Sequence, residues 1–311
     1  MHWRNARHLL IGAALCAVLP LVAHARQDDH VFKSIAELVV LHVNVFDKRS
    51  DAVPELPQSA FTVFEDDKPQ DITFFSAGDV PVTVGLIIDN STSMLTERDM
   101  IMSGTSAFAE SSHPEDEMFA IVFNEHVRAG LPDTLDFTRN RMQLRVSLQR
   151  FPPGGKTAFY DAVIAGLDHL EKAGYQKRVL VVLSDGGDNA SRHTEKDMLD
   201  RVSSGSALVY TVLDPSVVVP GESKPQVLRR LAKMSGGVAY FPKTGRQLVA
   251  NFQEIAGNIR RGYSIGYVPS SAQHHHNEQH RVKVMVRVPG RSDLSVRVRS
   301  GYTEAVTPGT H

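Results

Sequence analysis

Cysteine, tryptophan and long apolar runs are all scarce in this chain of 311 residues. Its single cysteine is Cys16, so the rest of the chain has no thiol for a disulfide or a thiolate metal site. No apolar run after residue 25 reaches the roughly 18 residues of a transmembrane helix, so we expect no membrane span in the mature chain. Neither charge sign predominates, with 34 basic and 35 acidic residues. This balance gives no support to nucleic acid or an anionic membrane as a partner.

Residues 1–25 are predicted to be a signal peptide. Arg4 and Arg7 precede an apolar stretch at 9–22, and Ala23-His24-Ala25 provides a small-residue cleavage pattern. The mature protein is therefore expected to be exported, and to be either periplasmic or secreted. Two alternatives stay open, namely an uncleaved membrane anchor and a lipoprotein attached through Cys16.

Hydrophobic patterns divide the mature chain into parts. Residues 36–80 show short strand patterns, 81–262 alternate strands with helices, 263–303 return to strands, and 304–311 form a tail. The alternation predicts an α/β fold with a doubly wound, mostly parallel sheet. Because the strands at both chain ends need a partner layer, we expect them to pair with each other. They would form a small all-β domain into which the α/β domain is inserted.

The α/β part shows a regular series of expected elements. Buried strands are predicted at 83–88, 117–123, 178–183, 207–213 and 238–241. Helices are predicted at 94–112, 138–149, 158–173, 194–204, 225–235 and 246–261. A short edge strand is expected within 126–132.

Polar residues follow two of these strands directly. Asp89, Ser91 and Ser93 come after the first strand, and Asp185 comes after the third. Thr157 follows Gly154-Gly155-Lys156 at the start of helix 158–173. Ligands bind beyond the carboxyl ends of parallel strands, and such oxygen donors suit a hard divalent cation. Taken alone, however, the Asp-x-Ser-x-Ser pattern is also typical of a helix cap.

Residues 82–262 resemble the von Willebrand factor A (VWA) domain, whose metal-ion-dependent adhesion site (MIDAS) combines a DxSxS loop, a later Thr and a later Asp. The resemblance implies that the hydroxyls of Ser91, Ser93 and Thr157 hold the cation. Asp89 and Asp185 would act largely through waters or hydrogen bonds. The cation would then complete its coordination with a carboxylate from a partner protein. Mg²⁺ suits such an open site, with Mn²⁺ or Ca²⁺ as alternatives.

Two residues depart from the VWA pattern, and three segments outside residues 82–262 extend the resemblance. Ser184 stands where the family often has Thr, and Lys156 lies between the glycines and Thr157. The segments 43–47, 61–66 and 72–76 look like parts of exported bacterial VWA-related proteins. This extends the likeness to most of the mature chain. Its similarity to integrin-type domains would also allow helix 246–261 to shift on binding.

The pattern favours divalent-cation-dependent protein–protein recognition or adhesion and predicts no enzyme activity. One alternative is a scaffold component of an envelope assembly in which the metal stabilises the fold. A metal-dependent hydrolase ranks third, because no nucleophile and base are evident. The Gly-Lys-Thr stretch lacks the first glycine of a P-loop, since Arg150 stands there. Asp89 after a buried strand also resembles the nucleophile of phosphatases that use an aspartate. Those enzymes have a second Asp two residues later as the acid/base, and Ser91 at this position cannot transfer the proton well at neutral pH.

A histidine-rich segment is a second candidate metal site. His274, His275, His276 and His280 provide imidazoles that suit Zn²⁺, Ni²⁺ or Cu²⁺. The simpler interpretation is a solvated hairpin loop.

Overall fold

Runs of β-branched and other apolar residues form the central sheet of the α/β part. The computed structural model describes residues 38–213, 220–270 and 278–304. The predictions for residues 1–25, for Cys16, for His274, His275 and His276 and for the tail from 305 lie outside the described residues. In the sheet the strand order is β10-β9-β8-β5-β6-β7. The strands are β5 (Thr83–Asp89), β6 (Glu117–Phe123), β7 (Val127–Ala129), β8 (Arg178–Leu183), β9 (Leu208–Val212) and β10 (Ala239–Tyr240).

The sheet is mostly parallel, as its sequence pattern predicts. β5 pairs in parallel with β6 on one side and β8 on the other, while β7 runs antiparallel to β6. Every residue of β5 is buried, because helices cover both faces of the sheet. The short edge strand expected within 126–132 is β7.

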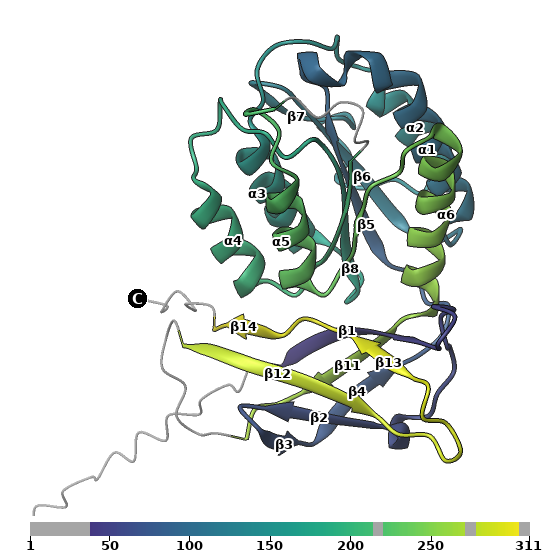
Figure 1. Ribbon diagram of the computed structural model, residues 1–311. Coiled ribbons are helices and arrows are strands. Elements are labelled where there is room, and N and C mark those ends of the chain that lie inside the picture. The colour runs from purple at the N-terminus through teal and green to yellow at the C-terminus, as the bar shows by residue number, and fades with distance from the viewer. Residues whose placement is uncertain (1–37, 214–219, 271–277, 305–311) are drawn as a thin grey trace, which may run out of the picture. The chain divides into compact units, whose positions relative to one another are not determined.

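Two layers of helices flank the sheet (Figure 1). On one face lie α1 (Arg98–Ser111), α2 (Arg141–Leu148) and α6 (Gly245–Arg261), and on the other lie α3 (Phe159–His169), α4 (Glu195–Ser204) and α5 (Pro225–Ser235). The fold class is therefore confirmed as a doubly wound α/β sheet. None of the described helices combines the length and the apolar character that crossing a membrane requires.

Three helices are shorter than predicted, each by several residues. A 3-10 helix occupies Thr92–Glu97, so α1 begins at Arg98 and not at 94. The side chain of Asn140 accepts hydrogen bonds from the amides of Met142 and Gln143 and so starts α2 later than predicted. α3 ends at His169 and continues as the 3-10 helix Leu170–Lys172.

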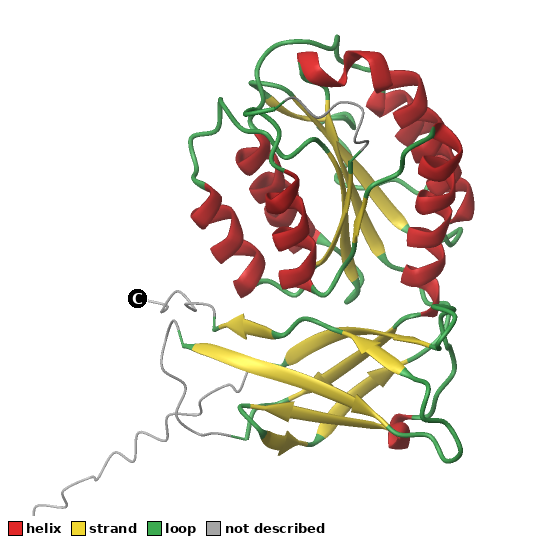
Figure 2. Ribbon diagram, viewed as in Figure 1, coloured by secondary structure: helices red, strands yellow, loops and turns green. Residues whose placement is uncertain are grey.

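Strands from both ends of the described chain form two antiparallel sheets, which are drawn in yellow in Figure 2 and labelled in Figure 1. Their orders are β13-β1-β11-β4 and β14-β12-β2-β3. The strands are β1 (Val39–Phe46), β2 (Phe61–Glu65), β3 (Lys68–Gln70), β4 (Ile72–Ser76), β11 (Tyr263–Tyr267), β12 (Gln279–Val286), β13 (Ser295–Arg297) and β14 (Gly301–Thr303), and a 3-10 turn covers Gln58–Ala60. β1 pairs with β11, and β2 pairs with β12. The predicted all-β layer from both ends is thus present, while the exact domain boundaries stay a prediction.

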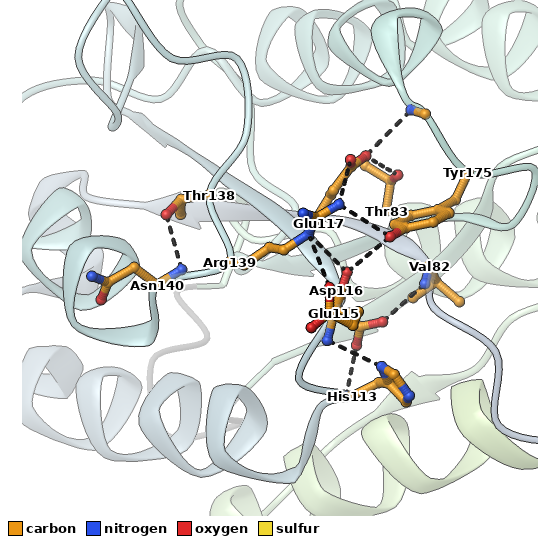
Figure 3. Close-up of polar contacts among 11 residues, drawn as sticks. Val82, Thr83, His113, Glu115, Asp116, Glu117, Thr138, Arg139, Asn140 and Tyr175 are labelled. Carbon is orange, nitrogen blue, oxygen red and sulfur yellow. Dashed lines mark hydrogen bonds and ion pairs between the residues drawn. The ribbon is translucent and has the colours of Figure 1, made fainter.

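The amino ends of β5 and β6 carry a polar network (Figure 3). The buried carboxylate of Asp116 accepts hydrogen bonds from the amides of Val82 and His113, each at 2.9 Å. Glu117 accepts from Thr83 Oγ1 at 3.2 Å and pairs with Arg139. These acids satisfy backbone donors and a neighbouring cation, so they serve the fold. Asp89 lies at the other end of β5.

Burial of His42 in β1 predicts a pH-dependent stability. His42 is 4% exposed, and burial, aided by the charges of Lys177 and Arg299, lowers its pKa from 6.5 to about 3. The folded protein keeps this imidazole neutral, whereas the unfolded chain takes up a proton below pH 6.5. The stabilising contribution is therefore present above pH 6.5 and is lost as the pH falls. At pH 5 the loss is about 2 kcal/mol, from about 1.4 kcal/mol per pH unit.

A His42→Gln variant tests this expectation, because glutamine stays polar but does not titrate near these pH values. Urea unfolding of both proteins at pH 7.5 and pH 5.0 would measure the four free energies. We expect the pH-dependent loss to be about 2 kcal/mol smaller in the variant. Equal losses in both proteins would contradict the expectation.

Candidate functional site

The first loop of the site follows β5 directly. Asp89 and Ser91 are each 1% exposed, and the amide of Ser91 donates to Asp89 Oδ1 at 3.0 Å. This bond turns the chain back at the strand end and places the hydroxyls of Ser91 and Ser93 together, with their Oγ atoms 3.1 Å apart. The structure thus brings three of the five predicted residues into one hydrogen-bonded group.

The second loop follows β8, the parallel neighbour of β5. Ser184 Oγ donates to Asp89 Oδ2 at 2.7 Å, which links the two strand ends. Asp185 is buried, and its carboxylate accepts from the amide of Gly187 and from Ser223 Oγ, each at 2.8 Å. The fourth predicted residue therefore lies on the loop joined to Asp89.

The third loop enters α3 and carries Thr157. The amide of Gly154 donates to the carbonyl oxygen of Asn90 at 2.8 Å, and the amide of Gly155 donates to Thr92 Oγ1 at 3.0 Å. Gly154 and Gly155 have φ values of 126° and 92°, a region that favours glycine. The glycine pair therefore lets this loop lie against the first one.

Thr157 is also tied to the loop after β8. Its amide donates to Asn189 Oδ1 at 2.9 Å, and its carbonyl accepts from the amide of Asn189 at 2.9 Å. Thr157 is 8% exposed. All three loops are thus linked by hydrogen bonds to one another, at the carboxyl ends of β5 and β8.

The electrostatics of the site are dominated by buried negative charge. Burial raises the pKa of Asp89 to about 6, and the charge of Asp185 adds to this effect, while hydrogen bonds from Ser91 and Ser184 oppose it. Among the ion pairs of the described residues, none includes Asp89 or Asp185. Two buried carboxylates and the paired hydroxyls of Ser91 and Ser93, with Thr157 on the adjoining loop, provide oxygen donors and excess negative charge. Such a set fits a hard divalent cation.

Sequence reasoning did not find several residues that support the site. Asn124 directly follows β6, and its Nδ2 donates to the carbonyl of Gly154 at 2.8 Å. Asn124 could have been recognised from the sequence, because it is a polar residue directly after an apolar strand, as Asp89 is. Ser223 and Asn189 had no such signal, because they reach the site from loops whose course is set by tertiary packing. Asp188, on the same loop as Asn189, serves the fold, because it accepts from the amide of Tyr160 at the start of α3 at 3.1 Å.

This chain is similar to solved structures in its fold, but the comparisons of its sequence found no match. No protein-family model matches the chain, and no curated protein matches it. A solved structure described as von Willebrand factor type A from Catenulispora acidiphila is similar at 14% identity and a TM-score of 0.51, covering 88% of this chain and 74% of that chain.

Two further solved structures are similar over somewhat more than half of this chain. One is an aerotolerance-related membrane protein from Bacteroides fragilis, at 16% identity and a TM-score of 0.47, covering 57% of this chain and 98% of that chain. The other is the vWF domain of the pilus tip protein Mfa5 from Porphyromonas gingivalis, at 11% identity and a TM-score of 0.49, covering 58% and 95%. The likeness to the Catenulispora acidiphila structure, with the helix-flanked parallel sheet, shows that this chain has the von Willebrand factor A fold.

Proposed function

We propose that this protein is an exported recognition module that binds Mg²⁺ at Asp89, Ser91, Ser93, Thr157 and Asp185. The observation that carries the proposal is the meeting of three loops at one end of the sheet, with buried carboxylates and hydroxyls on them. When bound, the cation would supply an electrophilic centre for an acidic side chain of a partner protein. The hydroxyls of Ser91, Ser93 and Thr157 would face it, and Asp89 and Asp185 would balance its charge.

The proposed roles follow from the hydrogen bonds of each residue. Asp89 already accepts from Ser91 and Ser184, and Asp185 from Gly187 and Ser223. Both carboxylates are therefore partly occupied and suit water-mediated contact with a cation. A cation with few direct anionic ligands keeps its attraction for an incoming carboxylate. Export is supported by the predicted signal peptide.

The hydroxyl of Thr157 provides the test. Thr157→Val keeps the shape of the side chain and removes the oxygen, whereas Thr157→Ser keeps the oxygen. In calorimetric titrations of chelator-treated protein, we expect the valine variant to bind Mg²⁺ about tenfold more weakly. The serine variant should bind within about threefold of the unchanged protein, since the ligand atom stays. Equal affinities for the valine variant and the unchanged protein would remove Thr157 from the site.

A second experiment distinguishes a recognition module from a scaffold component that the metal only stabilises. It compares capture of a partner with the melting temperature, each in Mg²⁺ and in EDTA. A recognition module should capture its partner from an envelope extract in Mg²⁺ and release it in EDTA, and the valine variant should fail to capture it. A stabilising metal should instead raise the melting temperature strongly in both the presence and the absence of partner. A fall of more than about 10 °C on chelation, without any Mg²⁺-dependent capture, would favour the scaffold.

A further inference from the structure

A second group of metal-ligating side chains lies in the β part, on segments far apart in sequence. Glu65 ends β2, Asp66 begins the turn to β3, and His280 lies near the start of β12. One ligand atom from each residue lies within 4.8 Å of those of the other two. The three residues do not belong to the α/β site, and Glu65 and Asp66 have no signal in sequence for this role.

The backbone holds this cluster in place. Asp66 and Asp67 have φ values of 47° and 65°, as in the two-residue turns that close tight hairpins. The amide of Asp66 donates to the carbonyl of Arg281 at 2.9 Å, and the amide of Arg281 donates to Asp66 Oδ1 at 2.9 Å. The turn between β2 and β3 is therefore bonded to the beginning of β12, which brings the imidazole beside the carboxylates.

The imidazole of His280 is oriented from two sides. Its Nδ1 lies 2.9 Å from Asp66 Oδ2, and its ring packs on that of Tyr302 with centroids 5.2 Å apart. His280 is 4% exposed, so its position is set by packing. The Asp66 carboxylate and the Tyr302 ring together therefore fix the orientation of the imidazole.

The carboxylate of Glu65 is 3% exposed, which is costly for an anion. Its Oε2 accepts from Tyr267 OH at 2.5 Å and from Tyr302 OH at 2.9 Å. Burial raises the pKa of both phenols, and so does Glu65, so they remain donors. In the described part of the chain no lysine or arginine forms an ion pair with Glu65. A metal cation would supply the positive charge that this buried carboxylate otherwise lacks.

We propose that Glu65, Asp66 and His280 bind a divalent transition metal, with Zn²⁺ as the best fit. One imidazole nitrogen and two carboxylate oxygens are ligands that Zn²⁺ takes in proteins, whereas Mg²⁺ prefers oxygen alone. Bonds of about 2.0–2.2 Å place tetrahedral ligand atoms roughly 3.4 Å apart, so the three ligand atoms must move closer together on binding. The side chain of Asp66, the exposed member of the cluster, can make most of that movement. The bound metal fastens the β2–β3 turn to β12. This site is independent of the proposed Mg²⁺ site.

Zn²⁺ titration of chelator-treated mature protein tests the proposal. The Asp89→Ala, Ser91→Ala background removes the other candidate metal site, and calorimetry measures the Zn²⁺ affinity. We expect saturable binding near one Zn²⁺ per chain, weakened at least about tenfold by Asp66→Asn and by His280→Ala. Asp67→Asn is the matched control, because Asp67 is the neighbouring turn residue and pairs with Arg281. It should leave the affinity unchanged.

Two control experiments complete the test. One checks that the Asp66 variant is still folded, and the other decides whether Zn²⁺ binds at this cluster or at the histidine-rich segment. Asn tolerates the φ of 47° at position 66, so Asp66→Asn should keep the melting temperature of the metal-free protein. A variant with His274, His275 and His276 changed to Ala should retain Zn²⁺ binding. The proposal is overturned by absence of saturable Zn²⁺ binding, by unchanged affinity in the Asp66 and His280 variants, or by loss of binding in the triple variant alone.

Discussion

Replacing Asp89 by asparagine is expected to weaken Mg²⁺ binding about 100-fold while leaving the metal-free protein at least as stable as before. The carboxylate is 1% exposed, and burial holds its pKa at about 6, so at neutral pH its charge opposes folding when no cation is bound. An amide has no such charge to desolvate. Its oxygen still accepts from the amide of Ser91, and the hydroxyl of Ser184 can rotate to accept from the new NH₂ group.

Two measurements check this expectation at pH 7.5. Calorimetry gives the Mg²⁺ affinity, and urea unfolding in EDTA gives the free energy of unfolding. Asp188→Asn is a matched control, because Asp188 lies on the same loop as Asp185 but bonds to the amide of Tyr160 and to Ser191. That variant should bind Mg²⁺ normally. If the Asp89 variant kept its Mg²⁺ affinity, or if it lost more than about 2 kcal/mol without metal, the carboxylate would serve the fold and not a cation.

The second large effect is expected from Gly237→Ala. A methyl group at this position would lie 2.0 Å from the carbonyl oxygen of Val209, within the sheet strand β9. That oxygen belongs to the backbone, so no side-chain rotation can relieve the contact. We expect a loss of about 3 kcal/mol, the upper part of the range for overpacking. The melting temperature should fall by about 10 °C for a domain of this size.

Thermal and urea unfolding of the variant measure this loss, and Gly257→Ala in α6 is the control. There the nearest atom to a new Cβ is the far end of the Arg261 side chain, at 2.7 Å, which can move away. Alanine also favours a helix interior over glycine by about 1 kcal/mol. The control should therefore be neutral or more stable. A Gly237 variant as stable as the control would show that the turn after α5 can shift without cost.

The predicted outline of the fold rested on local patterns, and these were sufficient. The apolar run of β5 and its neighbour β8 needed no partner to be recognised, because strands buried on both faces are apolar throughout. The helix starts were less accurate. α1 begins only at residue 98 because the 3-10 helix Thr92–Glu97 precedes it. Thr92 of that 3-10 helix accepts a hydrogen bond from the amide of Gly155, which lies on a loop far away in sequence. Local propensity has no information about such a contact.

The amino-acid sequence alone determined which residues follow each strand end, and so it placed Asp89, Ser91, Ser93 and Asp185 on loops that neighbouring parallel strands bring to one edge. Thr157 stands instead at the start of a helix, and its place in the site was implied by the resemblance to the VWA domain. Tertiary structure alone decided that Ser184 and Ser223 support the two carboxylates, and that Glu65 and Asp66 meet His280. The physical reason is the range of the interactions. Strand periodicity and turn chemistry act over a few residues, whereas a hydrogen bond across more than two hundred residues, as between Asp66 and His280, depends on the register and packing of the folded chain.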